Sequence, residues 1–238
     1  IPEKLYGRSR EIEQIIQTFK DIRSGRTELL LISGHSGIGK SALINEVRKP
    51  ITEYRGYFAT GKYDVFKRNV PYRAITQSLQ HLIRQILTEP EKAISAWKEK
   101  IQHAVGTNGR VVIEVIPELQ TLIGEQPEIA SLGAEEAQNR FSRVFQNLIQ
   151  ALATKEHPLA LFLDDMQWAD SSSLHLIKTV LLNPQIQHLC MILSFRDNEV
   201  PPSSPFARMI DELKIAERHP RELLLQPLTI ADVREMVR

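Results

Sequence analysis

The sequence is poor in cysteine, balanced in charge and free of long apolar runs. Its single cysteine, Cys190, cannot form a disulfide within the chain and lies in an apolar run, where burial as a small hydrophobic residue is expected. This sparing use of cysteine predicts a cytoplasmic location. Basic side chains number 30 and acidic ones 29, for a formal net charge of +1, which does not favour nucleic-acid binding. No apolar stretch approaches the roughly 20 residues that cross a bilayer, so we expect no membrane contact.

The length of 238 residues is enough for one large α/β domain, or for one domain and part of another. Hydrophobic residues make up 42% and charged residues 25%, proportions that are ordinary for a globular protein. The sequence begins with Ile1 and not with methionine. We therefore expect it to be a segment of a longer protein.

Short apolar runs alternate with amphipathic helical patterns along the chain. Apolar runs that are typical of strands buried on both faces occupy residues 28–33, 56–60, 159–163, 191–195 and 222–225. Helical patterns occupy residues 10–22, 40–48, 75–86, 91–105, 134–153, 171–182 and 206–216. Pro50 is expected to end the second helix, and Pro117 leaves residues 111–123 ambiguous. The alternation predicts a three-layer α/β fold with a mostly parallel sheet and a mostly helical segment over 66–155.

A phosphate-binding sequence lies between the first predicted strand and the helix that follows it. Residues 34–41 match the Walker A pattern G-x-x-x-x-G-K-[ST] at every fixed position. Its glycines let backbone N–H groups turn toward phosphate oxygens, next to the positive end of a new helix. Lys40 is expected to reach the β- and γ-phosphates, and the Ser41 hydroxyl to coordinate Mg²⁺. The expected nucleotide contacts are Gly34, His35, Ser36, Gly37, Ile38, Gly39, Lys40, Ser41 and Ala42.

Two neighbouring aspartates follow the predicted strand at 159–163. A phosphate-binding loop needs a carboxylate at the tip of a nearby strand to hold the magnesium ion, and Asp164 fits that role. Asp165 points differently and is expected to polarise the attacking water. Aspartate is also a common turn residue, but two of them after a complete phosphate-binding loop favour hydrolysis over binding alone. Catalytic roles are therefore predicted for Asp165 and Lys40.

Three further residues near these strand ends have two interpretations each. Asp170 is either the N-cap of the helix at 171–182, which we favour, or a catalytic group. Trp168 either packs in the core, which we favour, or stacks on adenine. Arg196 follows the strand at 191–195, and it either acts as a third catalytic residue on the γ-phosphate or is a surface arginine without a role.

These motifs together resemble the STAND class of signal-transducing P-loop ATPases, relatives of the AAA+ proteins. Residues 5–11 are similar to the hhGRExE motif of that class, with Ser9 in place of its first glutamate. The resemblance implies that Tyr6, Gly7 and Arg8 lie against the adenine and that Arg196 is the arginine at the end of the sensor strand.

The same resemblance implies a domain layout. Its sheet order is 5-1-4-3-2, with an added strand between the Walker A loop and the Walker B strand that ends at Asp164. Residues 225–229 are similar to the entrance of a helical lid. This implies an ATPase core over 1–228 and the start of a truncated lid over 229–238.

A narrower resemblance is to the ATPase module of large bacterial multi-sensor kinases. It depends on residues 61–64, 67–69, 136–141 and 196–200. In those proteins the module lies between a serine/threonine kinase domain and GAF and histidine-kinase domains, which implies such domains as partners in a longer chain. Lys62 and Asp64, which belong to this resemblance, are alternatively a solvated strand end.

The expected function is that of a regulatory switch that binds Mg·ATP and hydrolyses it slowly. ATP and Mg²⁺ are the expected cofactors, ADP is the product ligand, and self-association on ATP binding is a further expectation. The alternative is a nucleotide-binding scaffold with negligible turnover, against which Asp165 argues. Protein kinase activity in this sequence itself is not supported, because the H-R-D and D-F-G motifs are absent.

Overall fold

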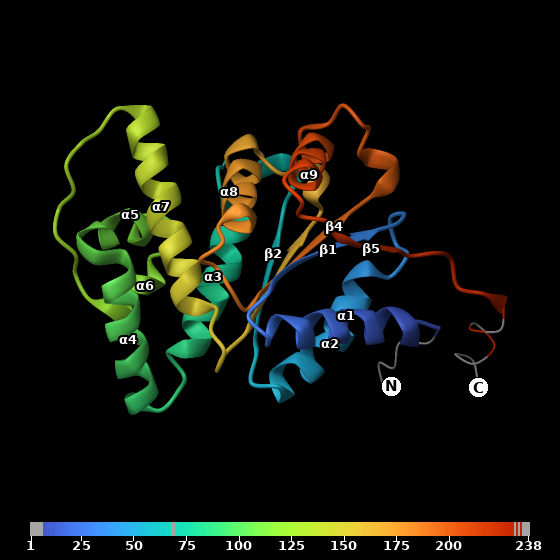
Figure 1. Cartoon of the computed structure of the whole chain (residues 1–238), viewed down its shortest axis with the longest axis horizontal. Helices are drawn as coiled ribbons and strands as arrows, with labels where there is room; N and C mark the ends of the chain where they lie inside the picture. Colours follow the sequence, from blue (N-terminus) through green and yellow to red (C-terminus); the bar gives the residue numbers. More distant parts are fainter. Residues whose placement is uncertain (1–6, 68–69, 231, 233, 235–238) are drawn as a thin grey trace.

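The computed structural model describes residues 7–67, 70–230, 232 and 234, and shows a five-stranded sheet between layers of helices (Figure 1). Its strands are β1 (Thr27–Ser33), β2 (Tyr57–Lys62), β3 (Leu159–Asp164), β4 (Leu189–Phe195) and β5 (Arg221–Leu224). They pair in parallel in the order β2-β3-β4-β1-β5. Read from the other edge this order is 5-1-4-3-2, so the expected α/β fold and sheet order are confirmed.

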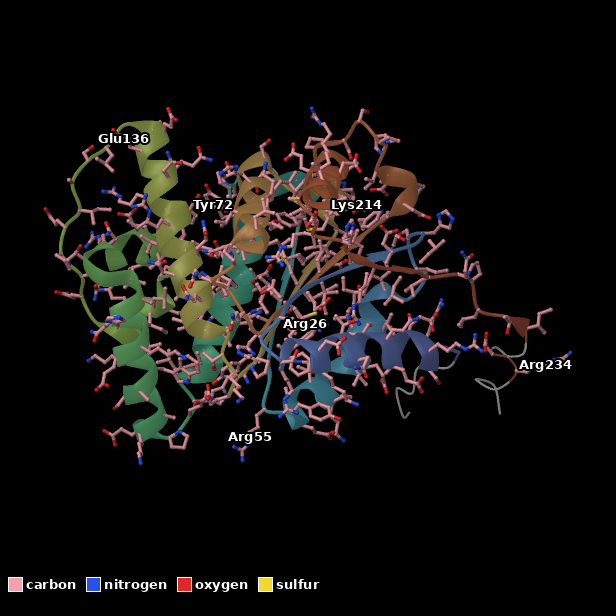
Figure 2. All side chains as sticks on the ribbon, in the orientation of Figure 1. Arg26, Arg55, Tyr72, Glu136, Lys214 and Arg234 are labelled. Carbon is pink, nitrogen blue, oxygen red and sulfur yellow. The ribbon has the colours of Figure 1, made fainter. Side chains whose placement is uncertain are left out.

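Alternate residues of the strands β1, β2, β3 and β4 supply two separate hydrophobic cores. In β1, Leu30 and Ile32 belong to one buried cluster, whereas Leu29 and Leu31 belong to the other. The reason is that successive side chains of a strand point to opposite faces of the sheet. Side chains fill the space between the sheet and both helix layers (Figure 2). The near-continuous apolar runs of these four strands follow from burial on both faces. The same expectation is wrong for β5, in which Glu222 and Leu224 are exposed and only Leu223 is buried.

Helices cover both faces of the sheet (Figure 1). One face carries α1 (Ser9–Ile22) and α2 (Lys40–Glu53). The opposite face carries α3 (Arg73–Ile86), α8 (Ser171–Leu182) and α9 (Pro205–Ile215). All five helices were predicted, with bounds within a few residues except for the end of α2.

A block of helices adjoins α3, on the side away from the sheet (Figure 1). Its members are α4 (Glu91–Val105), α5 (Gly109–Ile113), α6 (Glu118–Ile123) and α7 (Ala134–Leu152). The ambiguous residues 111–123 therefore form parts of two short helices, with Pro117 at the start of α6. The block is joined to the sheet by α3, which packs on β2 so closely that a Cβ on Gly61 would lie 1.8 Å from the Ala74 carbonyl oxygen.

The prediction that α2 ends before Pro50 is wrong. The helix continues to Glu53 with Pro50 inside its last turn. Proline at this position removes one N–H donor from the helix, but it leaves the bonds from Tyr54 and Gly56 back to the carbonyls of Pro50 and Ile51. Ile51 is buried in the core beneath α2, and this burial stabilises the extra turn.

Within the described residues, no helix combines the length and apolar character needed to cross a membrane. The helix predicted from Thr229 onward lies largely outside the described residues.

Candidate nucleotide-binding site

The phosphate-binding loop lies between β1 and α2, as predicted. Gly37 and Gly39 have positive φ angles of 77° and 100°, a conformation that other residues rarely adopt. Nothing lies within 4 Å of the place where a Cβ would stand on either residue. Gly39 is also the N-cap of α2. The loop therefore leaves open space where the N–H groups of the first helical turn begin.

Lys40 is the buried cation of this loop. It is 7% exposed, and its Nζ donates to the carbonyl oxygens of Gly34 and His35 at 2.6 and 2.9 Å. Burial lowers the pKa of Lys40, and the negative charges of Asp164 and Asp165 oppose that change. An ammonium group has three N–H donors, and these two bonds leave one for a phosphate oxygen.

Ser41 and Asp164 come together from the start of α2 and the end of β3. The Ser41 hydroxyl donates to Asp164 Oδ2 at 3.2 Å, and Asp164 Oδ1 accepts from the backbone N–H of Asp165 at 2.9 Å. A hydroxyl next to a buried carboxylate suits Mg²⁺, which prefers oxygen ligands and completes its shell with water and phosphate oxygens. The described residues contain no group of three or more His, Cys, Asp or Glu that could hold a metal. The Ser41 hydroxyl and the Asp164 carboxylate offer two oxygen ligands that fit a magnesium ion.

Asp165 has a left-handed backbone conformation, with φ of 56° and ψ of 46°. Aspartate tolerates this conformation better than most residues, and such residues cluster at functional sites. Its carboxylate is 5% exposed and meets Lys62 Nζ at 2.9 Å and Arg196 Nε at 3.4 Å. Gln167 Nε2 donates to the same carboxylate at 3.0 Å. Both oxygens of Asp165 therefore have cationic or hydrogen-bonding side chains as partners. Asp164 Oδ1 has a different partner, the Asp165 backbone N–H.

Lys62 also lines this pocket, although its sequence pattern did not predict a place in the site. It ends β2, directly opposite Asp164 in the parallel register, and its Nζ lies 3.5 Å from Asp164 Oδ2 as well as next to Asp165. The hydrogen bond to Asp165 raises the pKa of Lys62. The strand order 5-1-4-3-2, which the family resemblance implies, could have indicated this place for Lys62. It puts the strand that ends at Lys62 next to the strand that ends at Asp164.

Arg196 follows β4 and reaches the same pocket. Its Nη1 lies 2.7 Å from Glu199 Oε1, and its guanidinium lies over the Trp168 ring, 4.9 Å from the ring centre. The hydrogen bond to Glu199, followed by the charge of Asp165, raises the pKa of Arg196. Its contact with Asp165 favours a role at the site over a surface arginine without one, and action on the γ-phosphate stays a prediction.

Three other candidate residues make contacts that are typical of structural roles. Asp170 is the N-cap of α8, because its Oδ1 accepts from the Ser173 backbone N–H at 2.8 Å. Trp168 is half-buried against the larger core, as expected for a packing residue. Asp64 Oδ1 accepts from the Phe66 backbone N–H at 2.9 Å, which makes Asp64 a turn residue.

Two side chains of the phosphate-binding loop, those of His35 and Ile38, do not line the pocket. His35 is 66% exposed, with Nδ1 3.5 Å from Asp197 Oδ1, and Ile38 packs against the core beneath α2. Their expected nucleotide contacts would therefore come from the backbone.

The N-terminal motif lies close to the C-terminal segment. Tyr6 is outside the described residues. A Cβ on Gly7 would lie 2.5 Å from Asp232 Cγ, so the two chain segments touch there. Arg8 is buried and bonds to Glu11 and to two backbone carbonyls. The adenine contacts expected of these three residues stay predictions.

The loop, the two aspartates and the two flanking cations enclose one pocket of about 280 Å³ at the carboxyl edge of the sheet. Its lining residues are Ser36, Gly37, Gly39, Lys40, Ser41, Ala42, Lys62, Asp164, Asp165 and Arg196. Open parallel sheets bind ligands at this edge.

Known proteins resemble this chain in sequence and in fold. The family model of the AAA ATPase domain matches residues 4–192. Hybrid signal transduction histidine kinase G of Dictyostelium discoideum is 37% identical over 182 residues, which cover 76% of this chain and 5% of that protein. Histidine protein kinase 1 of Candida albicans is 25% identical over 195 residues, covering 76% of this chain and 8% of that protein.

A solved structure shows the same fold. The crystal structure of Cdc6p from Pyrobaculum aerophilum matches with a TM-score of 0.56 and 11% identity, over 100% of this chain and 50% of that one. At that identity the likeness concerns the fold alone.

Proposed function

We propose that this chain, which belongs to the AAA ATPase domain family, binds Mg·ATP at residues 34–42 and hydrolyses it slowly. The observation that carries the proposal is the convergence of Lys40, Ser41, Asp164 and Asp165 on one pocket, from α2 and from the end of β3. These side chains supply a cation for phosphate oxygens, an oxygen pair for a metal and a carboxylate for water.

Each side chain of the pocket has its own proposed task. Lys40 donates its third N–H to the phosphates, next to the backbone N–H groups of the loop. Bound Mg²⁺ would supply Lewis-acid stabilisation of phosphate charge, with Ser41 and Asp164 holding it. Asp165 accepts the proton of the attacking water at a carboxylate oxygen. Arg196 stabilises the charge that develops on the γ-phosphate.

The contacts of Asp165 support slow turnover. Lys62 and Arg196 both hold this carboxylate, so it accepts a proton only after giving up one of these contacts. A γ-phosphate carries more negative charge than a carboxylate and attracts both cations. We infer that ATP binding draws Lys62 and Arg196 away from Asp165, and that this exchange limits the rate of hydrolysis.

The second candidate function is a scaffold that holds nucleotide and hardly turns it over. The same two ion pairs favour it, because they keep Asp165 occupied. A single-turnover assay with excess protein over ATP separates the two functions. Phosphate release within minutes to hours supports the switch, and unchanged ATP after days supports the scaffold.

The surrounding protein is also part of the proposal. Two relatives are named as histidine kinases, and this chain spans only 5% and 8% of their lengths. We infer a STAND-class switch in a cytoplasmic signalling protein, with flanking kinase or GAF domains, a lid that begins at 229–238 and self-association on ATP binding. Nucleic acid is not an expected partner, given the net charge of +1.

Lys40→Ala tests the binding half of the proposal. Loss of this cation should weaken ATP binding at least about 100-fold, because charge-assisted bonds to phosphate are the strongest that the pocket offers. Lys49→Ala is the matched control, since Lys49 is an exposed residue of the same helix. Calorimetric titration of both variants with Mg·ATP makes the comparison. Equal ATP affinity in the two variants would show that the loop is not the binding site.

A further inference from the structure

Arg8 is an almost completely buried arginine beneath the phosphate-binding loop. It is 4% exposed, and arginine is almost never buried to this extent unless it is paired. Its Nη1 donates to Glu11 Oε1 at 3.0 Å, and its Nη2 donates to the carbonyl oxygens of Ile38 at 3.3 Å and Gln226 at 2.6 Å. One nitrogen, which carries two hydrogens, thus joins the loop to a segment 188 positions further along the sequence.

The bond to Ile38 acts on the peptide unit that also contains the N–H of Gly39. In a trans peptide the C=O and the N–H point in opposite directions. A cation on the Ile38 oxygen therefore fixes the direction of the Gly39 N–H, which points the opposite way within the peptide plane. Polarisation along such a chain of bonds strengthens the N–H as a donor. Gly39 lines the pocket, so this peptide unit lies at the edge of the proposed phosphate site.

The bond to Gln226 acts on the segment that follows β5. Leu225 donates its backbone N–H to the Ser33 carbonyl at 2.9 Å. A Cβ on Gly34 would lie 3.0 Å from the Leu225 carbonyl oxygen. Further on, Thr229 and Asp232 cap each other, with Asp232 Oδ2 accepting from the Thr229 backbone N–H at 2.8 Å. Segment 225–230 therefore touches the loop through Leu225, and Arg8 bonds to both the loop and the segment.

We propose that Arg8 is a positioning residue that couples the phosphate-binding loop to segment 225–230. Ordering of the loop by a phosphate ligand strengthens the Arg8 junction, and the junction orders the segment. By linkage, the segment in its docked position strengthens nucleotide binding by the same factor. The side chain acts through the Ile38–Gly39 peptide, to which it bonds directly. The inference depends on the proposed function in one respect, namely that the loop takes a phosphate.

Hydrogen exchange of the 238-residue chain, with and without Mg·ADP, tests the coupling. Wild type should show slower amide exchange in residues 225–230 when ADP is bound. Arg8→Gln should lose that protection even at saturating ADP, and should bind ADP about tenfold more weakly, the scale of one lost charge-assisted bond. Arg10→Gln is the matched control, because Arg10 is an exposed arginine of α1, and it should behave as wild type.

A purely structural role predicts a different result. Arg8→Gln would then lower the melting temperature and still show full ADP-dependent protection of 225–230, which would overturn the proposal. If Arg8→Gln does not fold, Arg8→Lys takes its place. It keeps the charge but lacks the planar guanidinium, which bonds Glu11 through one nitrogen and both carbonyls through the other. It should therefore lose most of the protection, and full protection in this variant would equally overturn the coupling.

A ligand-free measurement keeps this proposal separate from the proposed function. Without nucleotide, Arg8→Gln should speed exchange in residues 36–40 and 225–230 together, and Arg10→Gln should change neither. Failure of wild type to bind ADP contradicts the proposed function alone. Unchanged exchange of both segments in Arg8→Gln contradicts the Arg8 junction, whether or not ADP binds.

Discussion

Replacing Asp165 with asparagine should separate ATP binding from hydrolysis. Asparagine keeps the size of the side chain and one carbonyl oxygen that can accept from Gln167, but it lacks the carboxylate that accepts a proton. Positioned general bases contribute roughly 10²- to 10⁴-fold to a rate. We expect the single-turnover rate of Asp165→Asn to fall by about that factor.

Binding should survive the same change. Asp165 is not the carboxylate that accepts from Ser41, and its loss releases Lys62 and Arg196 toward the γ-phosphate. Lys62 is 60% exposed, so loss of its ion pair should lower the free energy of unfolding by no more than about 1 kcal/mol. Arg196 is 24% exposed and keeps its bond to Glu199, so it does not become an unpaired buried charge. ATP affinity should stay equal or become several-fold tighter, because about 1 kcal/mol corresponds to about fivefold.

Asp164→Asn is the matched comparison, because it alters the neighbouring carboxylate instead. It should weaken Mg²⁺-dependent ATP binding, since Asp164 is the partner of the Ser41 hydroxyl. Calorimetry with and without Mg²⁺, followed by a single-turnover time course of phosphate release over hours to days, gives both quantities for each variant. Equal loss of binding and of hydrolysis in both variants would refute the division of roles between the two aspartates.

Two smaller changes test other contacts of the site. Lys62→Gln should weaken ATP binding about three- to tenfold and leave ADP binding unchanged, because Lys62 contacts the two aspartates and not the phosphate-binding loop. Competitive titration measures the ratio of ATP affinity to ADP affinity. An equal effect on both nucleotides would show that Lys62 does not lie at the γ-phosphate. Asp170→Ala should lower the free energy of unfolding by about 1 kcal/mol through loss of the α8 cap, as measured by urea denaturation. Loss of hydrolysis at unchanged stability would instead make Asp170 a catalytic residue.

Much of the fold is visible in the sequence, because its signals are local. Strands buried on both faces require apolar side chains at successive positions, and residues 28–33 and 159–163 show this pattern. The phosphate-binding loop is equally local, since one continuous segment forms the strand, the turn and the helix. The order of the strands came from family resemblance, because periodicity contains no information on which strands pair.

The parts that were missed depend on contacts between distant segments. Lys62 enters the site only because β2 pairs with β3 in a register that sets it opposite Asp164. Pro50 was expected to end its helix, but burial of Ile51 against the sheet stabilises the last turn. The bond of Arg8 to Gln226 joins opposite ends of the chain, and the sequence around Arg8 gives no sign of it.

Calorimetric titration of the unaltered chain with ATP, with and without Mg²⁺, tests the central claim most directly. The geometry of Lys40, Ser41 and Asp164 predicts one ATP bound per chain, with an affinity that Mg²⁺ increases and that Lys40→Ala abolishes. Absence of ATP binding, or binding that neither Mg²⁺ nor Lys40→Ala affects, would contradict the assignment of this pocket.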